Sequence, residues 1–442
     1  MNDQLVTHPP ARPAVEVPGL VARTTWLEGP GDPLASLGPG GFAWFGEGWG
    51  FATAGEVARI PLGPGPDRLE RAAALVGGLL GGAVVDDEVR LAGTGPLAVG
   101  ALGFSSGDAG ALVVPARVVG IDPEGRRWVT ECAEASGGDP RPRPAVPPGA
   151  AARGPVAPSG SLPTGPAGAA SPGRLPTGSG GRDAFVSRVR AVLDRIEAGA
   201  VSKVVVARQE ELEGSLPYAV ATVVERLRRQ QPGCFVYASA GFVGASPELL
   251  VRRRGRVVES RPMAGTVPRA SRPADDDLRA SWLTSSPKER EEHLAVVGAV
   301  TGSLASVAHD LEVRGPELAR FPSVCHLVST VRAEVDAGGP SALALAGLLH
   351  PTPAVAGLPV AEALAVIAEL EPFPRGCYAG PVGWVDGRGD GEWAVAIRCA
   401  ELQGRRAVLT AGAGIVAGSG PATEWAETEA KLAPMRAALA ES

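Results

Sequence analysis

The chain has 442 residues, which is enough for one large domain or two smaller ones around a sizeable buried core. Its 42 Lys and Arg residues against 48 Asp and Glu residues give a formal net charge of −6, and its Arg-rich spots lack interleaved aromatic residues, so nucleic acid is not an expected partner. The five cysteines are scattered without a CxxC pair, which argues against a zinc site or a disulfide framework and favours a reducing, cytoplasmic location.

The sequence shows no pattern typical of secretion or membrane insertion. Its N-terminal residues lack the basic and then apolar layout of a signal peptide, and no apolar run reaches the roughly 18 residues that a membrane span needs. We therefore expect a soluble cytoplasmic protein without a membrane partner.

Residues 135–181 are dense in Pro, Gly and Ala and have almost no large apolar side chains. Such a segment cannot bury enough surface to offset the entropy that ordering it would cost. We predict a linker or surface loop here, which divides an N-terminal part at 15–134 from a C-terminal part at 182–442. The residues with chemical interest lie almost wholly in the C-terminal part.

After this segment the hydrophobic periodicity alternates between helical and strand patterns. Asp183 is a plausible N-cap for the first helix, and Ser286 followed by Pro287 marks the start of the second. The predicted elements are a helix at 183–199, strands at 202–212 and 234–239, a hairpin at 248–260 that turns at Arg254-Gly255, a helix within 286–310, a helix at 358–371, strands at 380–386, 393–402 and 405–416, and a helix at 421–432. Mostly antiparallel connections predict an α+β fold, in which antiparallel sheets carry helices outside.

Two pairs of glutamates share the spacing i, i+3 near the starts of predicted helices. Glu289 and Glu292 form the first pair, and Glu424 and Glu427 form the second. The first pair extends an apolar stripe and is therefore predicted to point toward the interior. Carboxylates from two helix N-termini could enclose a hard divalent cation, and Mg²⁺ prefers a few carboxylates, waters and an anionic substrate. The apolar stripe consists of Val296, Val300 and Val307.

Each glutamate pair also has a purely structural interpretation. Ser286 and Glu289 match a capping box, in which the two side chains satisfy the first N–H groups of a helix. Glu424 would complement the dipole of its own helix without any metal. Either pair alone leaves both interpretations open.

Three charged residues lie within or beside predicted strands. Lys203 shares a strand face with Val205 and Ala207, so desolvation would favour its neutral amine and suit it to act as a base, unless it reaches water from the strand end. Glu248 begins a strand, where burial would raise its pKa and keep a proton available for donation; an exposed hairpin glutamate is the alternative. Arg398 shares its strand face with alanines, which suits it either to hold a substrate carboxylate or to form a structural ion pair.

The glycine-rich stretch "AGAGI" at 411–415 shortly precedes the second glutamate pair. Glycines let a backbone approach a ligand closely, and successive N–H groups can bind an anion. A glycine-rich turn without a ligand would have the same composition.

Nine motifs, in order, make the C-terminal part similar to a known family. They are "SKVVVAR", "GASPELL", "RPMAGT", "PKEREEHL", "LHPTPAVAGLP", "ELEPFPRGCYAGPVGW", "WAVAIRCAEL", "AGAGIVAGSGP" and "EWAETEAKL". Together they resemble the chorismate-utilising enzymes, which include isochorismate synthase, salicylate synthase and the large component of anthranilate synthase. The resemblance covers residues 183–442, whereas the N-terminal part is similar only loosely, as in "PLAVGALGFS" at 96–105.

The resemblance implies a complex α/β sandwich of the chorismate-binding type, with two antiparallel sheets packed face to face and helices outside. It also implies that one Mg²⁺ and chorismate bind in a deep cleft. The implied roles are Glu292 and Glu427 as the closest metal ligands, Glu289 and Glu424 as supporting ligands, Arg398, Tyr378 and the amides around Gly412 and Gly414 as carboxylate-binding groups, and Gly265, Thr266 and His326 as the lining around the ring.

The nucleophile distinguishes the members of this family. In the water-using members, a lysine at the position of Lys203 activates water for attack at ring carbon 2, and a glutamate at the position of Glu248 protonates the departing ring-4 hydroxyl. Ala264 stands where aminodeoxychorismate synthases commonly carry a lysine nucleophile. The resemblance therefore implies isochorismate synthase, an isomerase that acts on chorismate as a monomer without a glutaminase subunit. Its product would serve menaquinone or siderophore biosynthesis.

Three alternatives belong to other activities or classes. Salicylate synthase would go on to eliminate pyruvate in the same pocket, although "LHPTPAVAGLP" and "AELEPF" are more similar to isochorismate synthase. An amine-using anthranilate-type synthase agrees less well with the presence of Lys203. A non-catalytic scaffold would hold a structural cation with the four glutamates and would not turn over chorismate.

Overall fold

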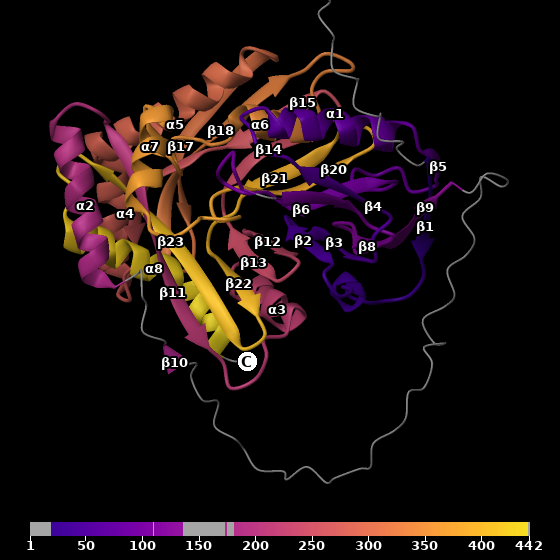
Figure 1. Ribbon diagram of the computed structural model, residues 1–442, viewed down its shortest axis with the longest axis horizontal. Helices are drawn as coiled ribbons and strands as arrows, with labels where there is room; N and C mark the ends of the chain where they lie inside the picture. The colour runs from indigo at the N-terminus through magenta and orange to yellow at the C-terminus, as the bar shows by residue number, and fades with distance from the viewer. Residues whose placement is uncertain (1–18, 109, 136–172, 175–180, 441–442) are drawn as a thin grey trace, which may run out of the picture.

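Figure 1 shows a computed structural model of the chain, which describes residues 19–108, 110–135, 173–174 and 181–440. Most of the predicted linker at 135–181 lies outside the described residues, as do residues 15–18 of the predicted N-terminal part. The strands within the described ranges form two large sheets.

The first sheet has 13 strands among the described residues, and all its pairings are antiparallel except the one between β1 and β5. Its order is β10 (Gly173–Arg174), β11 (Lys203–Glu213), β23 (Arg406–Val416), β22 (Cys399–Gln403), β13 (Phe242–Ser246), β12 (Phe235–Ser239), β2 (Phe42–Gly46), β3 (Trp49–Ala54), β8 (Arg117–Ile121), β9 (Arg127–Glu134), β1 (Leu20–Leu27) and β5 (Val84–Asp87), and β19 (Gly357–Leu358) also pairs with β11.

The second sheet has 10 strands in the described part of the chain, and all its pairings are antiparallel. Its order is β16 (Met263–Pro268), β18 (Val324–Glu334), β15 (Val257–Arg261), β14 (Leu249–Arg254), β21 (Gly391–Val395), β20 (Pro381–Asp386), β6 (Leu97–Ala101), β7 (Gly110–Val114) and β4 (Ala58–Leu62), and β17 (His309–Arg320) pairs with β18.

The two sheets enclose a core that is rich in aromatic side chains. Phe51 of the first sheet and Trp384 of the second meet edge to face, with ring centroids 6.0 Å apart. The indole N–H of Trp44 crosses the same space and donates to Glu392 over 2.8 Å. The expected face-to-face packing of two mostly antiparallel sheets is therefore confirmed.

Helices lie on the outer sides of the two sheets (Figure 1). In the first sheet, α2 and α8 pack on β11 and β23, and in the second sheet α4 and α5 pack on β16 and β18. The helices are α1 (Arg68–Gly81), α2 (Arg182–Glu197), α3 (Val220–Gln230), α4 (Pro273–Ser285), α5 (Pro287–Leu304), α6 (Ala342–Leu349), α7 (Val360–Leu370) and α8 (Pro421–Ala440), with one 3₁₀ turn, η1, at Pro33–Ser36.

The start of α5 agrees with its sequence signals, whereas the start of α2 does not. Pro287 is the first residue of α5, and the Ser286 hydroxyl accepts the Glu289 N–H over 3.4 Å. The N-cap of α2 is Gly181, so the prediction of Asp183 was wrong; that aspartate lies in the first turn instead. An acidic residue complements the helix dipole there without capping an N–H group.

The apolar stripe of α5 is shorter than predicted. Val296 and Val300 are buried against the sheet, but α5 ends at Leu304, and Val307 lies beyond it with 38% of its surface exposed. The helical periodicity continued by coincidence into the loop that follows.

The predicted strand at 393–402 is two strands that belong to different sheets. β21 ends at Val395 in the second sheet, and β22 begins at Cys399 in the first. Arg398 lies at the crossing with φ 54°, a left-handed conformation that is uncommon for a residue with a side chain. The prediction of one continuous strand was wrong, because the apolar residues continue across the point where the chain passes from one sheet to the other.

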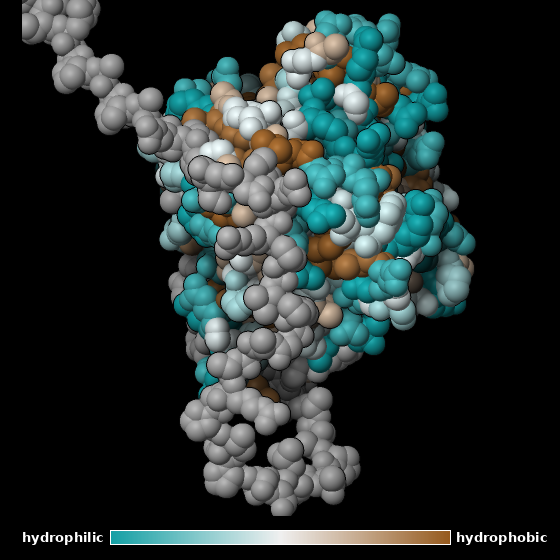
Figure 2. All heavy atoms as spheres, turned by 90° about the vertical axis from the view of Figure 1, so that its right-hand side faces the viewer, coloured by the Kyte–Doolittle hydropathy of each residue, from teal (hydrophilic) through white to brown (hydrophobic). Residues whose placement is uncertain are grey.

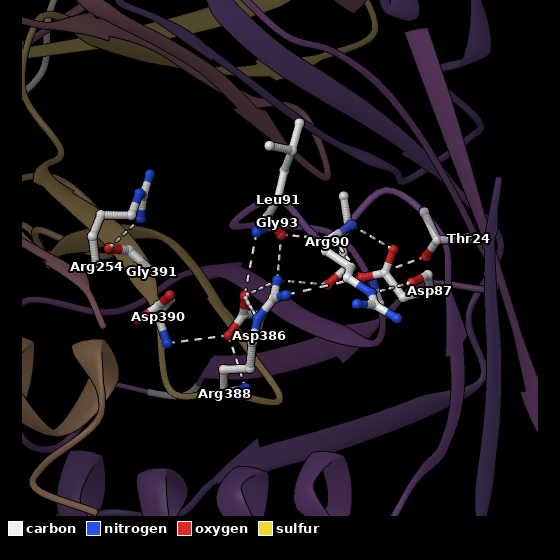
Figure 3. Close-up of polar contacts among 12 residues, drawn as sticks. Thr24, Asp87, Arg90, Leu91, Gly93, Arg254, Asp386, Arg388, Asp390 and Gly391 are labelled. Atoms are coloured by element: carbon white, nitrogen blue, oxygen red, sulfur yellow. Dashed lines mark hydrogen bonds and ion pairs between the residues drawn. The ribbon is translucent and has the colours of Figure 1, made fainter. Parts of the chain in front are cut away.

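The N-terminal and C-terminal parts contribute strands to both sheets. In the first sheet β2 pairs with β12, and in the second β6 pairs with β20. Figure 3 shows polar contacts that also join the N-terminal part to the C-terminal part. Asp386 accepts the Gly93 N–H over 3.3 Å. Arg388 donates to Asp386 and to the backbone oxygens of Leu91 and Thr94. Both sheets are therefore a scaffold that the two parts share.

No helix within the described ranges is long and apolar enough to cross a membrane. Figure 2 faces the end of the molecule where β1 and β5 lie, and its hydrophobic areas are patches among hydrophilic ones. The exposed large apolar side chains along this edge include Trp26, Val84 and Val85.

Candidate active site

A cavity between the ends of the two sheets gathers residues from strands that are far apart in the sequence. Of the residues that the sequence predicts for the site, all but Glu289 and Glu424 line it. They are Lys203, Glu248, Gly265, Thr266, Glu292, His326, Tyr378, Arg398, Gly412, Gly414 and Glu427, and Lys431 joins them.

The predicted base lies at the start of β11 on the cavity wall. Lys203 is 4% exposed, and its Nζ donates to Glu292 Oε1 of α5 over 2.7 Å. The side chain therefore does not reach bulk water from the strand end, which was the alternative. Burial raises the pKa of Glu292, but the neighbouring Lys203 ammonium outweighs burial and leaves that pKa below its ordinary value.

The predicted acid lies between β13 and β14 and lines the same cavity. Glu248 is 5% exposed, which contradicts the alternative of an exposed hairpin glutamate. Burial raises the pKa of Glu248 to about 7, against the opposing effects of the Met263 backbone N–H and the Lys203 ammonium. A large fraction of Glu248 is therefore protonated at neutral pH and can donate a proton.

The four glutamates of the two helix starts are close enough to perturb one another. Glu289 is 8% exposed and Glu424 is 7% exposed. Burial and then the charge of Glu292 raise the pKa of Glu289, and burial and then the charge of Glu427 raise the pKa of Glu424 to about 7. Carboxylates that oppose one another's ionisation are oxygen donors whose charge a divalent cation would neutralise, so the chemistry of these four side chains, though not their present arrangement, fits Mg²⁺.

Two of these carboxylates are engaged by lysines. Glu292 pairs with Lys203, and Glu427 Oε1 pairs with Lys431 Nζ over 2.5 Å. Within the described residues, no three acidic, histidine or cysteine side chains lie close enough together to hold a metal ion as they stand. Binding of a cation by the glutamates would therefore require them to turn away from the lysines.

Arg398 is a half-buried cation that lines the cavity. No carboxylate in the described part of the chain forms an ion pair with its guanidinium, so the alternative of a structural ion pair is not supported. One Nη group donates to His326 Nε2 over 3.2 Å, while His326 Nδ1 lies 3.0 Å from Thr266 Oγ1. Burial and the charges of Arg398 and Lys431 hold the pKa of His326 well below its usual range. The imidazole is therefore neutral, and the positive charge of Arg398 is available to an anionic substrate.

The glycines of β23 direct two backbone N–H groups away from β11. Gly412 and Gly414 stand opposite Ala207 and Val205, whose own N–H groups donate to acceptors outside β23. In an antiparallel ladder, opposite residues either exchange both hydrogen bonds or neither, so the glycine N–H groups are not bonded to β11. On the other side, β22 pairs with β23 only as far as Thr410. Both N–H groups are therefore free to meet an anion in the cavity.

The same two glycines leave space for side chains of the site. A Cβ atom on Gly412 would lie 2.8 Å from the Tyr378 hydroxyl, and one on Gly414 would lie 2.9 Å from Lys203 Cε. Each glycine thus lets a neighbouring functional side chain lie directly against the backbone.

We expect Gly414→Ala to lower the turnover number by roughly tenfold or more, because the added methyl group would displace the Lys203 amine from a fixed geometry. The fold should survive, since the atom in the way is the far end of a flexible side chain. Gly298→Ala on α5 is the matched control, because its Cβ would meet nothing. Steady-state rates and circular dichroism would check both variants, and parent-like turnover in Gly414→Ala would contradict this role.

The sequence did not lead us to predict a role for Lys431 or for the buried ion pair of Glu371 and Arg375. Lys431 follows Glu427 by four residues on one helical face, a spacing that could have indicated it. Glu371 accepts the Ala207 N–H, and Arg375 donates to the Val205 carbonyl, each over 2.8 Å. This pair holds β11 in place next to Lys203 without reaching the cavity itself.

A carboxyl group with a raised pKa, a buried lysine and a guanidinium without an ion pair among the described residues line one cavity, which suits a small anionic substrate. The family described as "Chorismate binding enzyme" matches residues 175–440. This protein belongs to the chorismate-binding enzyme family.

Individual relatives agree with this assignment. The chain is 41% identical over 267 residues to isochorismate synthase DhbC of Bacillus subtilis, an alignment that covers 58% of this chain and 67% of that protein. It is 40% identical over 241 residues to isochorismate synthase EntC of Escherichia coli, covering 53% and 61%. The fold matches MenF, the menaquinone-specific isochorismate synthase of Escherichia coli, with a TM-score of 0.75 at 22% identity over 96% of this chain and 95% of that one.

Proposed function

We propose that this protein is an isochorismate synthase, which converts chorismate to isochorismate by attack of water at ring carbon 2 and loss of the ring-4 hydroxyl. The observation that carries the proposal is that Lys203 and Glu248 line one cavity and that burial raises the pKa of Glu248 to about 7. The names of the relatives described above support the same activity.

The substrate carries two carboxylates, and the cavity offers cationic and N–H groups to both. Arg398, the Tyr378 hydroxyl and the N–H groups of Gly412 and Gly414 would hold them. The ring would then lie against Gly265, Thr266 and His326, the remaining lining residues that the family resemblance assigns.

The reaction needs one proton removed and one supplied at different ring positions. Lys203 would take a proton from the attacking water as the bond from oxygen to ring carbon 2 forms. The two ring double bonds shift, and the bond from ring carbon 4 to its hydroxyl breaks as Glu248 donates its proton, so that water leaves. Atoms balance, because one water enters and one departs.

Glu292 and Glu427 would hold a Mg²⁺ ion, with Glu289 and Glu424 in support. When bound, the cation would supply positive charge to the substrate carboxylate that lies beside it. The residues of this chain remain responsible for orienting chorismate and for both proton transfers.

A product analysis tests the proposed function. Purified protein is incubated with chorismate and Mg²⁺ in the absence of ammonia, and the products are separated by chromatography and identified by mass spectrometry. Isochorismate without pyruvate is expected. Salicylate with an equal amount of pyruvate would instead identify a salicylate synthase, and a nitrogen-containing product upon adding ammonia would identify the amine-using branch. Melting that responds to Mg²⁺ without turnover would identify a scaffold.

The proposed acid also predicts how stability depends on pH. Because the pKa of Glu248 is about 7 in the folded protein and 4.5 in a free side chain, the folded state binds more protons than the unfolded state between these values. The free energy of unfolding of metal-free protein should therefore fall as pH rises from 4.5 to 7. Glu248→Gln should remove the contribution of Glu248 to this dependence, whereas Glu424, whose pKa is also raised to about 7, should keep its own. At pH 8 the free energy of unfolding of Glu248→Gln should exceed that of the parent by about 3 kcal/mol, since each pKa unit corresponds to about 1.4 kcal/mol.

Urea denaturation of the parent and Glu248→Gln between pH 4.5 and 8 would measure this difference. Glu225→Gln, at an exposed position of α3, is the control and should follow the parent at every pH. If the difference in free energy of unfolding between Glu248→Gln and the parent did not grow with pH, Glu248 would already be ionised in the folded state.

A further inference from the structure

All three lysines of the chain lie at the candidate metal site. Only three of its 42 Lys and Arg residues are lysines, at positions 203, 288 and 431. They come from β11, α5 and α8, which are separate in the sequence. Each lysine forms an ion pair with a different member of the glutamate cluster.

The three ion pairs differ in distance and in burial. Lys203 lies 2.7 Å from Glu292 and Lys431 lies 2.5 Å from Glu427, and the two lysine side chains are 5% and 13% exposed. Lys288 is half exposed and lies 3.9 Å from Glu289. Thus the two glutamates that the family resemblance assigns as closest metal ligands are the two that pair with the less exposed lysines.

Several other buried carboxylates of this protein are paired with arginine. Glu392 binds Arg252 and Arg254, and Glu371 accepts two hydrogen bonds from Arg375. The planar guanidinium holds a carboxylate through several donors in a fixed geometry, whereas a lysine ammonium is a compact point charge on a flexible chain. Arginine is therefore suited to a permanent pair, and lysine to a pair that must open.

We propose that Lys203 and Lys431 are exchangeable counter-ions, which occupy Glu292 and Glu427 until a divalent cation displaces them into the cavity. This inference rests on the proposed function, because it takes the two glutamates as metal ligands. The displaced side chains would then face the substrate. Lys203 would face the attacking water as the neutral amine that the proposed proton transfer requires, and Lys431 would lie beside the Gly412 carbonyl that it already contacts over 2.9 Å. Cation binding and binding of an anionic substrate would favour one another, and this coupling would be reciprocal.

Direct titration of substrate-free protein with Mn²⁺ or Mg²⁺ tests the exchange. Isothermal calorimetry would compare the full-length parent with Lys431→Met, which keeps the length of the side chain and removes its charge. We expect Lys431→Met to bind the cation about tenfold more tightly, because no buried ion pair has to open first. Lys431→Arg should bind it more weakly than the parent, because the guanidinium holds Glu427 through more than one donor.

Lys288→Met is the matched control, since Lys288 also pairs with a glutamate of the cluster but is half exposed. The affinity of Lys288→Met for the cation should stay within about twofold of that of the parent, because most exposed ion pairs contribute little free energy. If Lys288→Met and Lys431→Met gained cation affinity equally, the cause would be the general loss of positive charge, and the proposed exchange would be overturned. Parent-like affinity in folded Lys431→Met and Lys431→Arg would overturn it too.

Lys203→Met provides a second variant if Lys431→Met does not fold, as judged by circular dichroism. It should also bind the cation more tightly, although it loses turnover. Failure of the exchange can be separated from failure of the proposed function. If the parent makes isochorismate with Mg²⁺ while the lysine variants leave cation affinity unchanged, only the exchange is wrong. If the parent binds no divalent cation even with chorismate present, the metal site itself is wrong, and the exchange with it.

Discussion

Lys203→Ala and Glu248→Gln should each lower the rate of isochorismate formation by about 10²- to 10⁴-fold, the usual cost of losing a general acid or base. The structure supports an effect of this size because both side chains are buried and line one cavity. Chorismate should still bind both variants, since Arg398 and Tyr378 are unchanged. Rapid-quench rates and equilibrium binding of chorismate would measure the two effects separately.

The pH dependence of the parent distinguishes the two residues. Because the pKa of Glu248 is about 7, kcat/KM of the parent should fall above that pH as the acid loses its proton. Residual activity of Glu248→Gln should lack this alkaline limb, since Gln does not titrate. If Lys203→Ala kept near-parent turnover, water activation by Lys203 would be excluded and the amine-using branch of the family would again be open.

Glu292→Gln and Glu427→Gln should each weaken Mg²⁺ binding by about a hundredfold, because a charged oxygen ligand is lost while the volume of the side chain is kept. Glu289→Gln should have a smaller effect, since its backbone N–H still bonds to the Ser286 hydroxyl. Calorimetric titration in the presence of chorismate would give the three affinities. Circular dichroism must accompany it, because Glu292 and Glu427 each hold a lysine that the substitution leaves without its charged partner.

If all three glutamine variants bound Mg²⁺ like the parent, the carboxylate cluster would be structural. In that case the lysine pairs would be permanent, and the raised pKa values of Glu289 and Glu424 would reflect burial and repulsion between carboxylates in a structural cluster. Glu401→Gln, at an exposed position of β22, provides a control for the loss of one negative charge elsewhere.

Short sequence patterns correctly predicted the features that depend on residues close together in the sequence. Ser286 and Pro287 marked the start of α5 because an N-cap and a first-turn proline act within four residues. The burial of Lys203 followed from strand alternation, since its face is shared with Val205 and Ala207. The ordered family motifs brought together the lining residues of the cavity, which no periodicity could have done.

Features that depend on long-range pairing were not predictable in this way. The change of sheet at Arg398 leaves the apolar alternation intact, so the pattern is the same for one strand or two. The pairing of Trp44 with Tyr237 joins strands almost two hundred residues apart, and neither segment encodes its partner. Lys431 illustrates a third limit: a glutamate and a lysine four residues apart on a helix usually form a solvated pair, and only the fold decides that this one is buried.

The central claim, that water is the nucleophile, is tested most directly by a single turnover of chorismate in ¹⁸O-labelled water with Mg²⁺. The account predicts isochorismate that carries one ¹⁸O atom, located at the ring-2 hydroxyl, because the oxygen at ring carbon 4 leaves and solvent oxygen enters. Mass spectrometry of the product and of its fragments would locate the label. Isochorismate without ¹⁸O would mean that the original hydroxyl migrates within the substrate, and it would contradict the roles assigned to Lys203 and Glu248.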